Sequence, residues 1–445
     1  MKDVIIELMD EKKYAKAREE VVELNAIDIA ELLEELETAN AVILFRMLPK
    51  DISVEVFANL SNEYQQHIIN AITDREIDHI MDELFFDDMI DLIEELPATI
   101  VKKILKNTKE EERRLINQFL KYPADSAGSL MTIEYVGLKK EMTVKHALEY
   151  IKRIAIDKET IYTCYVMNAN RKLEGIASLR KLVISDDSKT VGEIMDKGVI
   201  SVNTHDDQEA IAHVFRKYGF IALPVVDKEE RLIGIITIDD IVDVIEQENT
   251  EDFHKMAAME PSEEEYLETS VFVLAKKRIG WLLALMISAI FTGSIIKSFE
   301  DVLQSVVALA AFMPMLMGTG GNAGAQSSTL IIRGMALGEI ELEDISKVIW
   351  KELRVSSLVG IILSLINFIR LFYFQSVELN IAMTVCATLF IVVILAKIVG
   401  GTLPIIARRF KLDPAIMASP MITTIVDAVS LFVYFSIAST LLGLR

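Results

Sequence analysis

Residues 414–442 are the feature that most limits what this chain can fold into. They are almost wholly apolar and exceed the roughly 20 residues that a membrane-spanning helix needs. Asp427 is their only charged residue, and a carboxylate near the middle of a bilayer is costly unless it faces a polar path or a partner. Small or hydroxylated residues surround it. We therefore predict that Asp427 lines a cation pathway.

Two other interpretations of Asp427 stay open from the sequence. The carboxylate could form an ion pair with Lys397, or it could be protonated and hydrogen-bonded between helices. Lys397 lies seven residues before Pro404, near one end of another apolar stretch. Its long side chain is expected to extend to the membrane interface.

Charge divides the 445-residue chain into a soluble part and a membrane part. Residues 1–270 carry 57 acidic and 32 basic side chains, whereas residues 271–445 carry 10 and 14. Such an acidic soluble part repels phosphate backbones, which argues against a nucleic-acid partner, and it attracts divalent cations. Cys164 and Cys386 lie in different parts, so we expect no disulfide framework and a cytoplasmic soluble part. The charged, amphipathic first helix does not read as a signal peptide.

An internal repeat organises residues 1–125. The segment DIAELLEEL at 28–36 returns as EIDHIMDEL at 76–84, and the Leu-Pro pair at 48–49 returns at 96–97 with the same offset. Repeated helices of this kind predict a short right-handed α-superhelix with a continuous core. Within it, Asp87 and Asp91 share one helix face. They are read either as part of a cation site or as the acidic first turn of a helix.

Residues 126–250 carry a second duplication, in which short strands alternate with helices. The pattern at 165–179 returns at 224–238. This stretch resembles a tandem CBS (cystathionine-β-synthase) pair, an α/β pseudo-dimer that often senses nucleotides or ions. In nucleotide-binding members a Thr or Ser followed three residues later by Asp holds the ribose. Thr237 and Asp240 match that signature.

The first copy lacks this acid, because it has Ser178 and Lys181. Because the second copy has the complete signature, ATP is a candidate ligand, with Thr237 and Asp240 as its contacts. The alternative is a CBS pair that only transmits force between domains.

The end of the second copy is unusually acidic. This stretch carries Asp239, Asp240, Asp243, Glu246, Glu248, Glu251 and Asp252, and Asp207 and Glu209 are expected nearby. The acids form either a solvated face or a set of ligands that cations draw together. Oxygen ligands without a cluster of His or Cys favour Mg²⁺ or Ca²⁺ over zinc.

A connector over residues 251–278 leads to an all-α membrane part over residues 279–445. Residues 263–275 are expected to form one long helix along the membrane surface, with a plain linker helix as the alternative. Five spans are predicted, at 279–299, 303–337, 355–374, 381–404 and 415–442. The distribution of Lys and Arg places the N-terminal domains in the cytoplasm and the C-terminus, with Arg445, outside.

The second span is rich in glycine and polar residues, with PMLMGTGGNAGAQSS at 314–328. Polar groups of this kind are tolerated in a membrane where they line a cavity or pack against protein. We expect a broken helix that lines a cavity, because Asn322 and Gln326 add polar side chains at i,i+4 spacing. Close packing of helices through small residues is the alternative.

This order of domains resembles the MgtE-type magnesium channels. The motifs PxxxGTGGNAGAQS at 314–327 and LDPAxxxSPxxTTxxDA at 412–428 carry the resemblance. It implies a homodimer whose pore is lined by the second and fifth spans, with a pore carboxylate at Asp427 and an acid at the cytoplasmic mouth at Asp413. It also implies acids that bind cytosolic Mg²⁺, which match Asp87, Asp91, Glu209, Asp240, Asp243, Glu248, Glu251 and Asp252. A sensing position that is acidic in some members is Gly219 here, which weakens that single ion site.

We therefore expect a Mg²⁺-selective uptake channel of the cell (inner) membrane. Mg²⁺ sheds water reluctantly, so two Asp427 carboxylates could hold a largely hydrated ion whose waters touch Asn322 and Thr424. High cytosolic Mg²⁺ would join the N domain, the CBS pair and the connecting (plug) helix and close the pore. Low Mg²⁺ would let the acids repel one another.

Rival functions are a CBS-regulated transporter of another divalent cation, of anions or of organic solutes, and a non-transporting membrane sensor of Mg²⁺ or nucleotide. An enzyme is not expected, because the membrane part has no His and no nucleophile–base pair is apparent. Beyond a second copy and membrane lipid, no obligate partner is expected.

Overall fold

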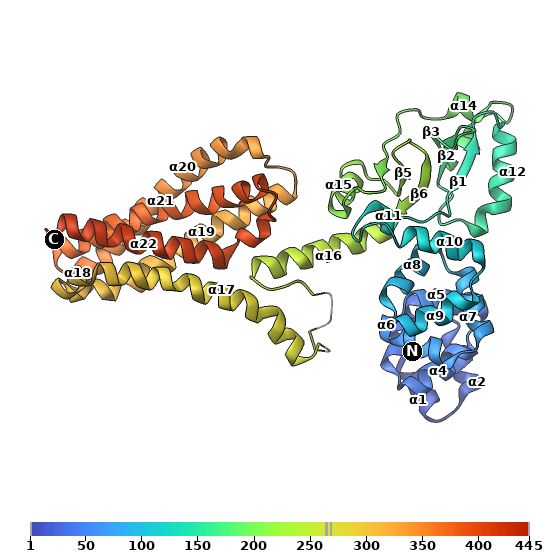
Figure 1. Ribbon diagram of the computed structural model, residues 1–445, viewed down its shortest axis with the longest axis horizontal. Coiled ribbons are helices and arrows are strands. Elements are labelled where there is room, and N and C mark those ends of the chain that lie inside the picture. The colour runs from blue at the N-terminus through green and yellow to red at the C-terminus, as the bar shows by residue number, and fades with distance from the viewer. Residues whose placement is uncertain (1, 263–265, 268, 444–445) are drawn as a thin grey trace. The chain divides into compact units, whose positions relative to one another are not determined.

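The computed structural model describes residues 2–262, 266–267 and 269–443 (Figure 1). The chain forms two compact units, Met1–Ile245 and Glu246–Arg445. The first unit holds the N domain and two small β-sheets, and the second holds the long apolar helices. The boundary between them falls within one helix, α16 (Ile238–Met256).

The N domain is a stack of short helices (Figure 1). Their bounds are α1 Lys2–Asp10, α2 Tyr14–Val21, α3 Ala26–Glu35, α4 Thr38–Met47, α5 Lys50–Ala58, α6 Asn62–Ala71, α7 Asp74–Glu83, α8 Phe86–Glu95, α9 Ala98–Asn107 and α10 Glu110–Phe119. Helices α3 to α6 return in the same order as α7 to α10, as the repeat in the sequence predicts. Leu48 and Leu96 end α4 and α8 in extended conformation, because the residue before proline disfavours the helical region.

The remainder of the first unit consists of two matching halves. The first half has α11 Ala127–Leu130, β1 Val136–Lys139, α12 Val144–Ile154, β2 Thr163–Met167, β3 Leu173–Ser178 and α13 Leu179–Ile184. The second has α14 Val191–Ile194, β4 Val202–Asn203, α15 Gln208–Tyr218, β5 Ala222–Val226, β6 Leu232–Thr237 and the start of α16. In each half the first strand pairs parallel with the second, which pairs antiparallel with the third.

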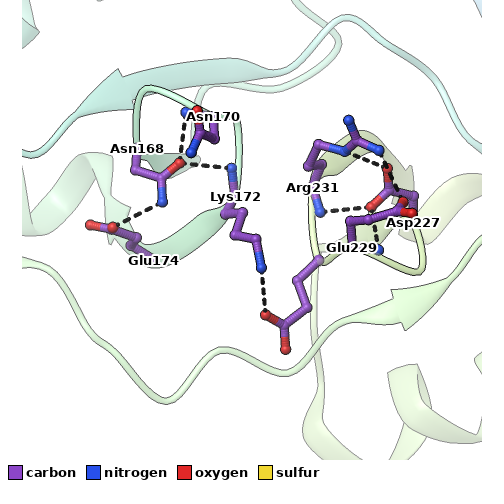
Figure 2. A network of polar contacts seen from close by, with 8 residues as sticks. Asn168, Asn170, Lys172, Glu174, Asp227, Glu229 and Arg231 are labelled. Atoms are coloured by element: carbon purple, nitrogen blue, oxygen red, sulfur yellow. Dashed lines mark hydrogen bonds and ion pairs between the residues drawn. The ribbon is translucent and has the colours of Figure 1, made fainter.

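The turns that follow β2 and β5 join the two halves (Figure 2). Asn168 Oδ1 accepts the backbone N–H groups of Asn170 and Lys172, and at the equivalent position of the second half Asp227 Oδ1 accepts those of Glu229 and Arg231. The two turns then bond to each other, with N···O distances of 3.1 Å from Leu173 to Glu230 and 3.0 Å from Leu232 to Arg171. The duplication in the sequence is therefore a duplication of local hydrogen bonding.

The N domain and the second half share one continuous hydrophobic core. Phe119 packs edge-on against Phe86 with ring centroids 4.6 Å apart, and Tyr122 packs edge-on against His205 at 6.0 Å. This packing fixes the start of α8, with its acidic first turn, against the part of the first unit that contains the β-sheets.

The second unit is built around the helix α21 (Leu379–Arg409), which packs against α19, α20 and α22 (Figure 1). The elements of this unit besides α21 are α17 Val271–Ser298, α18 Glu300–Ser305, η2 Val307–Phe312, α19 Met313–Ala336, η3 Leu342–Asp344, α20 Ile345–Ile369, η4 Arg370–Phe374, η5 Pro414–Met417 and α22 Ser419–Leu441. Among the described residues, four helical segments are long and apolar enough to cross a membrane: Val271–Ser298, Leu342–Phe374, Leu379–Arg409 and Ser419–Leu441.

Helix α19 is long enough to be a fifth span but does not reach the same apolar character. The expected break at its centre is wrong, because Met313–Ala336 is one uninterrupted helix. The irregular backbone lies before it, in the 3₁₀ segment Val307–Phe312. The glycines therefore do not free backbone groups to line a cavity.

The glycines of α19 instead let neighbouring helices approach closely. A Cβ on Gly324 would lie 2.7 Å from Ile422 Cγ2, and a Cβ on Gly400 would lie 2.2 Å from the carbonyl oxygen of Gly324. A Cβ on Gly320 or Gly321 would lie within 2.9 Å of α22 side chains. The alternative interpretation, packing through small residues, accounts for this stretch.

The connector also differs from expectation. Helix α16 continues past the predicted domain boundary at residue 250 and ends at Met256, and the next long helix begins at Val271. Residues 266–267 and 269 are not helical, so the helix expected over residues 263–275 is wrong for this part. Residues 263–265 and 268, and Arg445, lie outside the described residues.

We predict that Gly400→Ala lowers the thermal midpoint of the purified protein, because the added methyl group would force α19 and α21 apart at a cost of about 1–3 kcal/mol. Gly280→Ala is the matched control, since a Cβ there meets nothing within 4 Å and alanine favours a helix. Thermal unfolding in detergent measures both variants. Equal midpoints for the two would contradict the close contact.

Candidate ion-binding sites

Asp427 lies on α22, half-buried, with its Oδ1 atom shielded from solvent. Among the described residues this oxygen has no hydrogen-bond partner, and no basic group there forms an ion pair with the carboxylate. A charged group held in this way needs a cation or water from outside the chain. The interpretation of Asp427 as one partner of a Lys397 ion pair is therefore wrong.

Lys397 does not extend to the interface as expected, because its side chain is only 6% exposed. Its ammonium instead contacts Gln326 Oε1 at 3.5 Å and Ser327 Oγ at 3.4 Å on α19. The expected snorkelling is wrong because the close approach of α21 and α19 places these polar acceptors within reach of the ammonium.

The other residues expected along the ion path come from two helices. Asn322 and Gln326 of α19 are exposed in the single chain and share one helix face. Thr424 of α22 is half-buried, and its hydroxyl donates to the carbonyl of Pro420 at 3.0 Å. Its oxygen can still accept a hydrogen bond, as a hydrated ion would require.

Asp413 begins the segment Pro414–Met417 and uses both of its carboxylate oxygens. Oδ1 accepts the N–H of Ala415 at 2.8 Å, and Oδ2 accepts the ammonium of Lys255 at 2.6 Å. Lys255 also bonds to Glu251, one turn earlier on α16. Burial would lower the pKa of Lys255, but its hydrogen bonds to the two carboxylates outweigh burial and raise it.

Two of the expected metal-binding acids, Glu251 and Asp413, thus meet around a lysine of the chain itself. The sequence analysis missed Lys255, although its i,i+4 spacing from Glu251 is visible in the sequence. Its contact with Asp413, 158 residues away, is a product of the tertiary fold.

A second group of acids gathers where α8 meets the β-sheet unit. Asp87 is only 8% exposed, and burial, followed by the charges of Asp240 and Asp88, raises its pKa well above the usual value. Burial is also the main cause that raises the pKa of Asp88 and of Asp240 to about 6. The structure therefore brings together Asp87 and Asp240, which the sequence placed in different domains.

Glu134 and Glu159 join this acidic group and were missed by the sequence analysis. The N–H of Glu159 donates to the carbonyl of Glu134 at 3.0 Å, so the two loop residues are neighbours. Burial and then the charges of Asp239 and Asp240 raise the pKa of Glu159 to about 7. No spacing in the sequence marks these two acids, because each lies in a loop that folding carries to α16.

The other expected sensing acids are more dispersed. Glu209 is exposed in the first turn of α15, and Asp243 is exposed on α16. Asp91 lies on α8, and Glu248 and Asp252 are half-buried on α16. Gly219 ends α15 at φ +65°, a left-handed conformation that glycine adopts without strain and that an acidic residue adopts less readily.

Within the described residues, no three His, Cys, Asp or Glu side chains converge closely enough to hold one metal ion. Mg²⁺ does not require such a cage, because it keeps several waters and is usually bound by one or two carboxylates. Pairs such as Asp87 and Asp240 therefore have the chemistry for an ion that stays largely hydrated.

The candidate nucleotide contacts bond to each other. Thr237 Oγ1 donates to Asp240 Oδ2 at 2.7 Å, and the backbone N–H of Thr237 approaches the same oxygen at 3.4 Å. In the first half, Ser178 caps α13, and Lys181 forms a 2.6 Å ion pair with Asp196. The two halves thus differ as their sequences indicate.

Comparisons with known proteins cover both units of the chain. Residues 24–125 match the MgtE intracellular N domain, residues 191–247 the CBS domain and residues 313–437 the MgtE divalent cation transporter family. The chain is 37% identical over 441 residues to the magnesium transporter MgtE of Thermus thermophilus, covering 98% of this chain and 97% of that protein. The chain belongs to the MgtE family. The MgtE of Bacillus subtilis is 34% identical over 435 residues, covering 98% and 96%.

Solved structures of MgtE relatives match the first unit. The soluble part of a magnesium transporter aligns with TM-score 0.52 and 30% identity, covering 56% of this chain and 97% of that chain. The cytosolic domain of the Mg²⁺ channel MgtE in complex with ATP aligns with TM-score 0.52 and 34% identity, covering 54% and 99%. The family, the N domain, the CBS pair and a helical membrane part are thereby confirmed, and the chain is a transporter rather than an enzyme.

We predict that, in EDTA, the thermal midpoint of this protein falls as pH rises between about 4 and 7. Asp88, Asp240 and Glu159 have raised pKa values in the folded protein, so the folded state binds more protons than the unfolded state in this window. Stability present at low pH is then lost as these groups ionise. Calorimetry of the detergent-solubilised protein measures the change.

The control for this pH dependence is the variant Asp240→Asn/Glu159→Gln, which removes two of the titrating carboxyls. Its midpoint should change less across the same window. A midpoint that rises with pH in the native protein, or an unaltered slope in the variant, would contradict the assignment.

Proposed function

We propose that this chain is a magnesium channel that takes up Mg²⁺ across the cell (inner) membrane and closes when cytosolic Mg²⁺ is high. The relatives that span nearly the whole chain are named magnesium transporters. The observation that carries the proposal is the half-buried Asp427 carboxylate in an apolar helix, whose shielded Oδ1 has no hydrogen-bond partner among the described residues. A cation that passes along α22 would supply the missing charge.

The proposed pore is formed by two copies, with α19 and α22 of each along the shared axis and the C-terminus outside. The exposed polar face of α19, with Asn322 and Gln326, is then covered by the second copy rather than by lipid. Two Asp427 carboxylates would attract a divalent ion more strongly than a monovalent one, and Asn322 and Thr424 could bond to its retained waters.

The proposed gate uses the acids at the start of α16. Asp87 of the N domain and Asp240 of α16 lie close enough for each to raise the other's cost of ionisation, and their pKa values are raised, so ionising both is unfavourable unless a cation offsets their charges. High cytosolic Mg²⁺ would bind between them and hold the N domain on the CBS pair, and low Mg²⁺ would release it. Because α16 runs on as the connecting helix, this change would reach the membrane unit.

At the other end of α16 the chain supplies its own cation. Lys255 pairs with both Glu251 and Asp413, so it bridges these two acids without a metal ion, although it offsets only one of their two charges. We therefore place the Mg²⁺-dependent step at the N-domain end of α16, around Asp87 and Asp240. Glu209, Asp243, Glu248 and Asp252 are proposed as further, more exposed ligands.

ATP binding by the CBS pair is proposed as a second function. A relative of known structure, 34% identical over the cytosolic part, was solved in complex with ATP. Thr237 is buried at the end of β6, and Asp240 is half-buried in the first turn of α16. Because Asp240 also belongs to the acidic group, ATP and Mg²⁺ would affect each other's binding through it.

Among the rivals, a non-transporting sensor would not need the unpartnered Asp427. A transporter of another divalent cation agrees with the same carboxylate, since the matched family is described as divalent cation transporters. Competition between Mg²⁺ and Co²⁺ or Mn²⁺ for uptake distinguishes it from the proposed channel.

We predict that Asp427→Asn lowers Mg²⁺ uptake into proteoliposomes by at least about a hundredfold, because it removes the charge that offsets ion dehydration and burial. Asp301→Asn, at an exposed acid on α18, is the matched control and should retain uptake. Size-exclusion chromatography checks that both variants assemble like the native protein. Native flux in Asp427→Asn would refute the pore assignment.

We predict that Asp240→Asn/Asp243→Asn raises the internal Mg²⁺ concentration needed for closure by about tenfold, because two charges that favour bound cations are lost. Asp186→Asn removes an exposed acid elsewhere in the CBS pair and serves as the control. Channel recording with Mg²⁺ on the cytoplasmic face measures the closing concentration. If both variants close at the native concentration, these acids do not sense Mg²⁺.

A further inference from the structure

A buried polar cluster lies inside the membrane unit, away from Asp427. Lys397 of α21 is 6% exposed, Glu352 of α20 is 9% exposed and Ser327 of α19 is 1% exposed. A lysine and a glutamate are rarely buried this far within apolar helices unless they are paired, and such residues usually serve a function. Neither charge belongs to the ion path described above.

Ser327 connects the two charges. Its hydroxyl donates to Glu352 Oε2 at 2.6 Å, and its oxygen accepts from the Lys397 ammonium at 3.4 Å. The hydroxyl can do both, because it has one proton to donate and two lone pairs. One side chain from each of α19, α20 and α21 therefore forms a single neutral chain of hydrogen bonds.

The backbone around this cluster leaves little room for movement. The Cβ of any residue at Gly401 of α21 would lie 3.1 Å from Glu352 Cγ. One residue earlier, the Cβ at Gly400 would overlap the carbonyl oxygen of Gly324, which lies one turn before Ser327. The three helices thus cross at a tight junction, and the polar chain fixes which residues meet there.

The same junction determines where α19 presents its polar face. Lys397 also reaches Gln326 Oε1 at 3.5 Å, and because an ammonium only donates, it holds the amide by its oxygen. Gln326 lies one turn after Asn322 on the exposed face of α19. On the neighbouring side, Gly320 and Gly324 pack against Val426, the residue before Asp427. A shift of α19 would therefore move Asn322 relative to Asp427.

We propose that Lys397, through Ser327 and Glu352, is a positioning residue for the ion path. It holds α19 in the register that sets the spacing between Asn322 and Asp427, and it touches no ion itself. This inference rests on the proposed transport function. It assigns a role to a buried lysine and glutamate that lie outside the two membrane motifs, and to the serine that links them.

The test compares single hydroxyl deletions at adjacent buried positions of α19. Ser327→Ala removes the link between Lys397 and Glu352, whereas Ser328→Ala removes a buried hydroxyl that donates to the carbonyl of Met417 at 2.8 Å. Mg²⁺ uptake into proteoliposomes over a range of external Mg²⁺ gives the half-saturating concentration and the maximum rate. We expect Ser327→Ala to raise the half-saturating concentration about threefold or more, and Ser328→Ala to leave it unchanged.

A second variant, Lys397→Met/Glu352→Gln, removes both charges together so that neither is left buried and unpaired. We expect it to raise the half-saturating concentration about tenfold. Lys297→Met, at an exposed lysine near the end of α17, is its control. Thermal midpoints in detergent establish that each variant is folded, and if the double variant does not fold, Ser327→Ala decides.

The two kinetic constants separate positioning from stability. A cluster that only stabilised the fold would reduce the number of working channels and hence the maximum rate, with the half-saturating concentration unchanged. An unchanged half-saturating concentration in folded Ser327→Ala would therefore overturn the inference. Failure of the native protein to take up Mg²⁺ would instead refute the proposed function, so the two failures are distinguishable.

Discussion

The carboxylate of Asp427 lies in an apolar helix with no positive group of the described residues paired to it, and the proposed ion path depends on that charge. The helix that carries it packs on α19 through glycines, which bring an exposed polar face beside it. In the proposed channel, this charge would give a passing cation a favourable position in an environment that otherwise repels it.

The other buried and half-buried acids fall into two groups, those close to a lysine of the same chain and those without one. Glu251 and Asp413 meet at Lys255, and Glu352 is linked to Lys397 through Ser327, so each of these acids has a lysine of the same chain close to it. Within the part of the chain that the structure describes, Asp87 and Asp240 form no such pair with a cation, and their pKa values are raised. The second group is therefore the one where an external cation would lower the cost of ionisation, which is why the proposed response to Mg²⁺ is assigned to it.

Helix α16 matters to this division because one helix bears both kinds of acid. Its first turn contributes Asp239 and Asp240 to the group that lacks a cation, and its last turns contribute Glu251 and Lys255 to the group that a lysine bridges. The proposed gate thus has one end that depends on the ion and one end that stays attached without it.

The sequence by itself determined the two internal repeats, the apolar helices and the presence of a single charge, Asp427, in the last of them. These features follow from the periodicity and composition of the sequence, which depend on residues that lie close together along the chain. Only the tertiary structure decided that α19 is unbroken, that Lys397 is buried, that Lys255 meets Asp413, and that Glu134 and Glu159 join the acids near Asp240. Each of these depends on which residues distant in the chain come into contact, and helical spacing carries no information about such contacts. A glycine-rich helix reads alike whether its neighbours are water, lipid or another backbone, and here the neighbour is the backbone of α21.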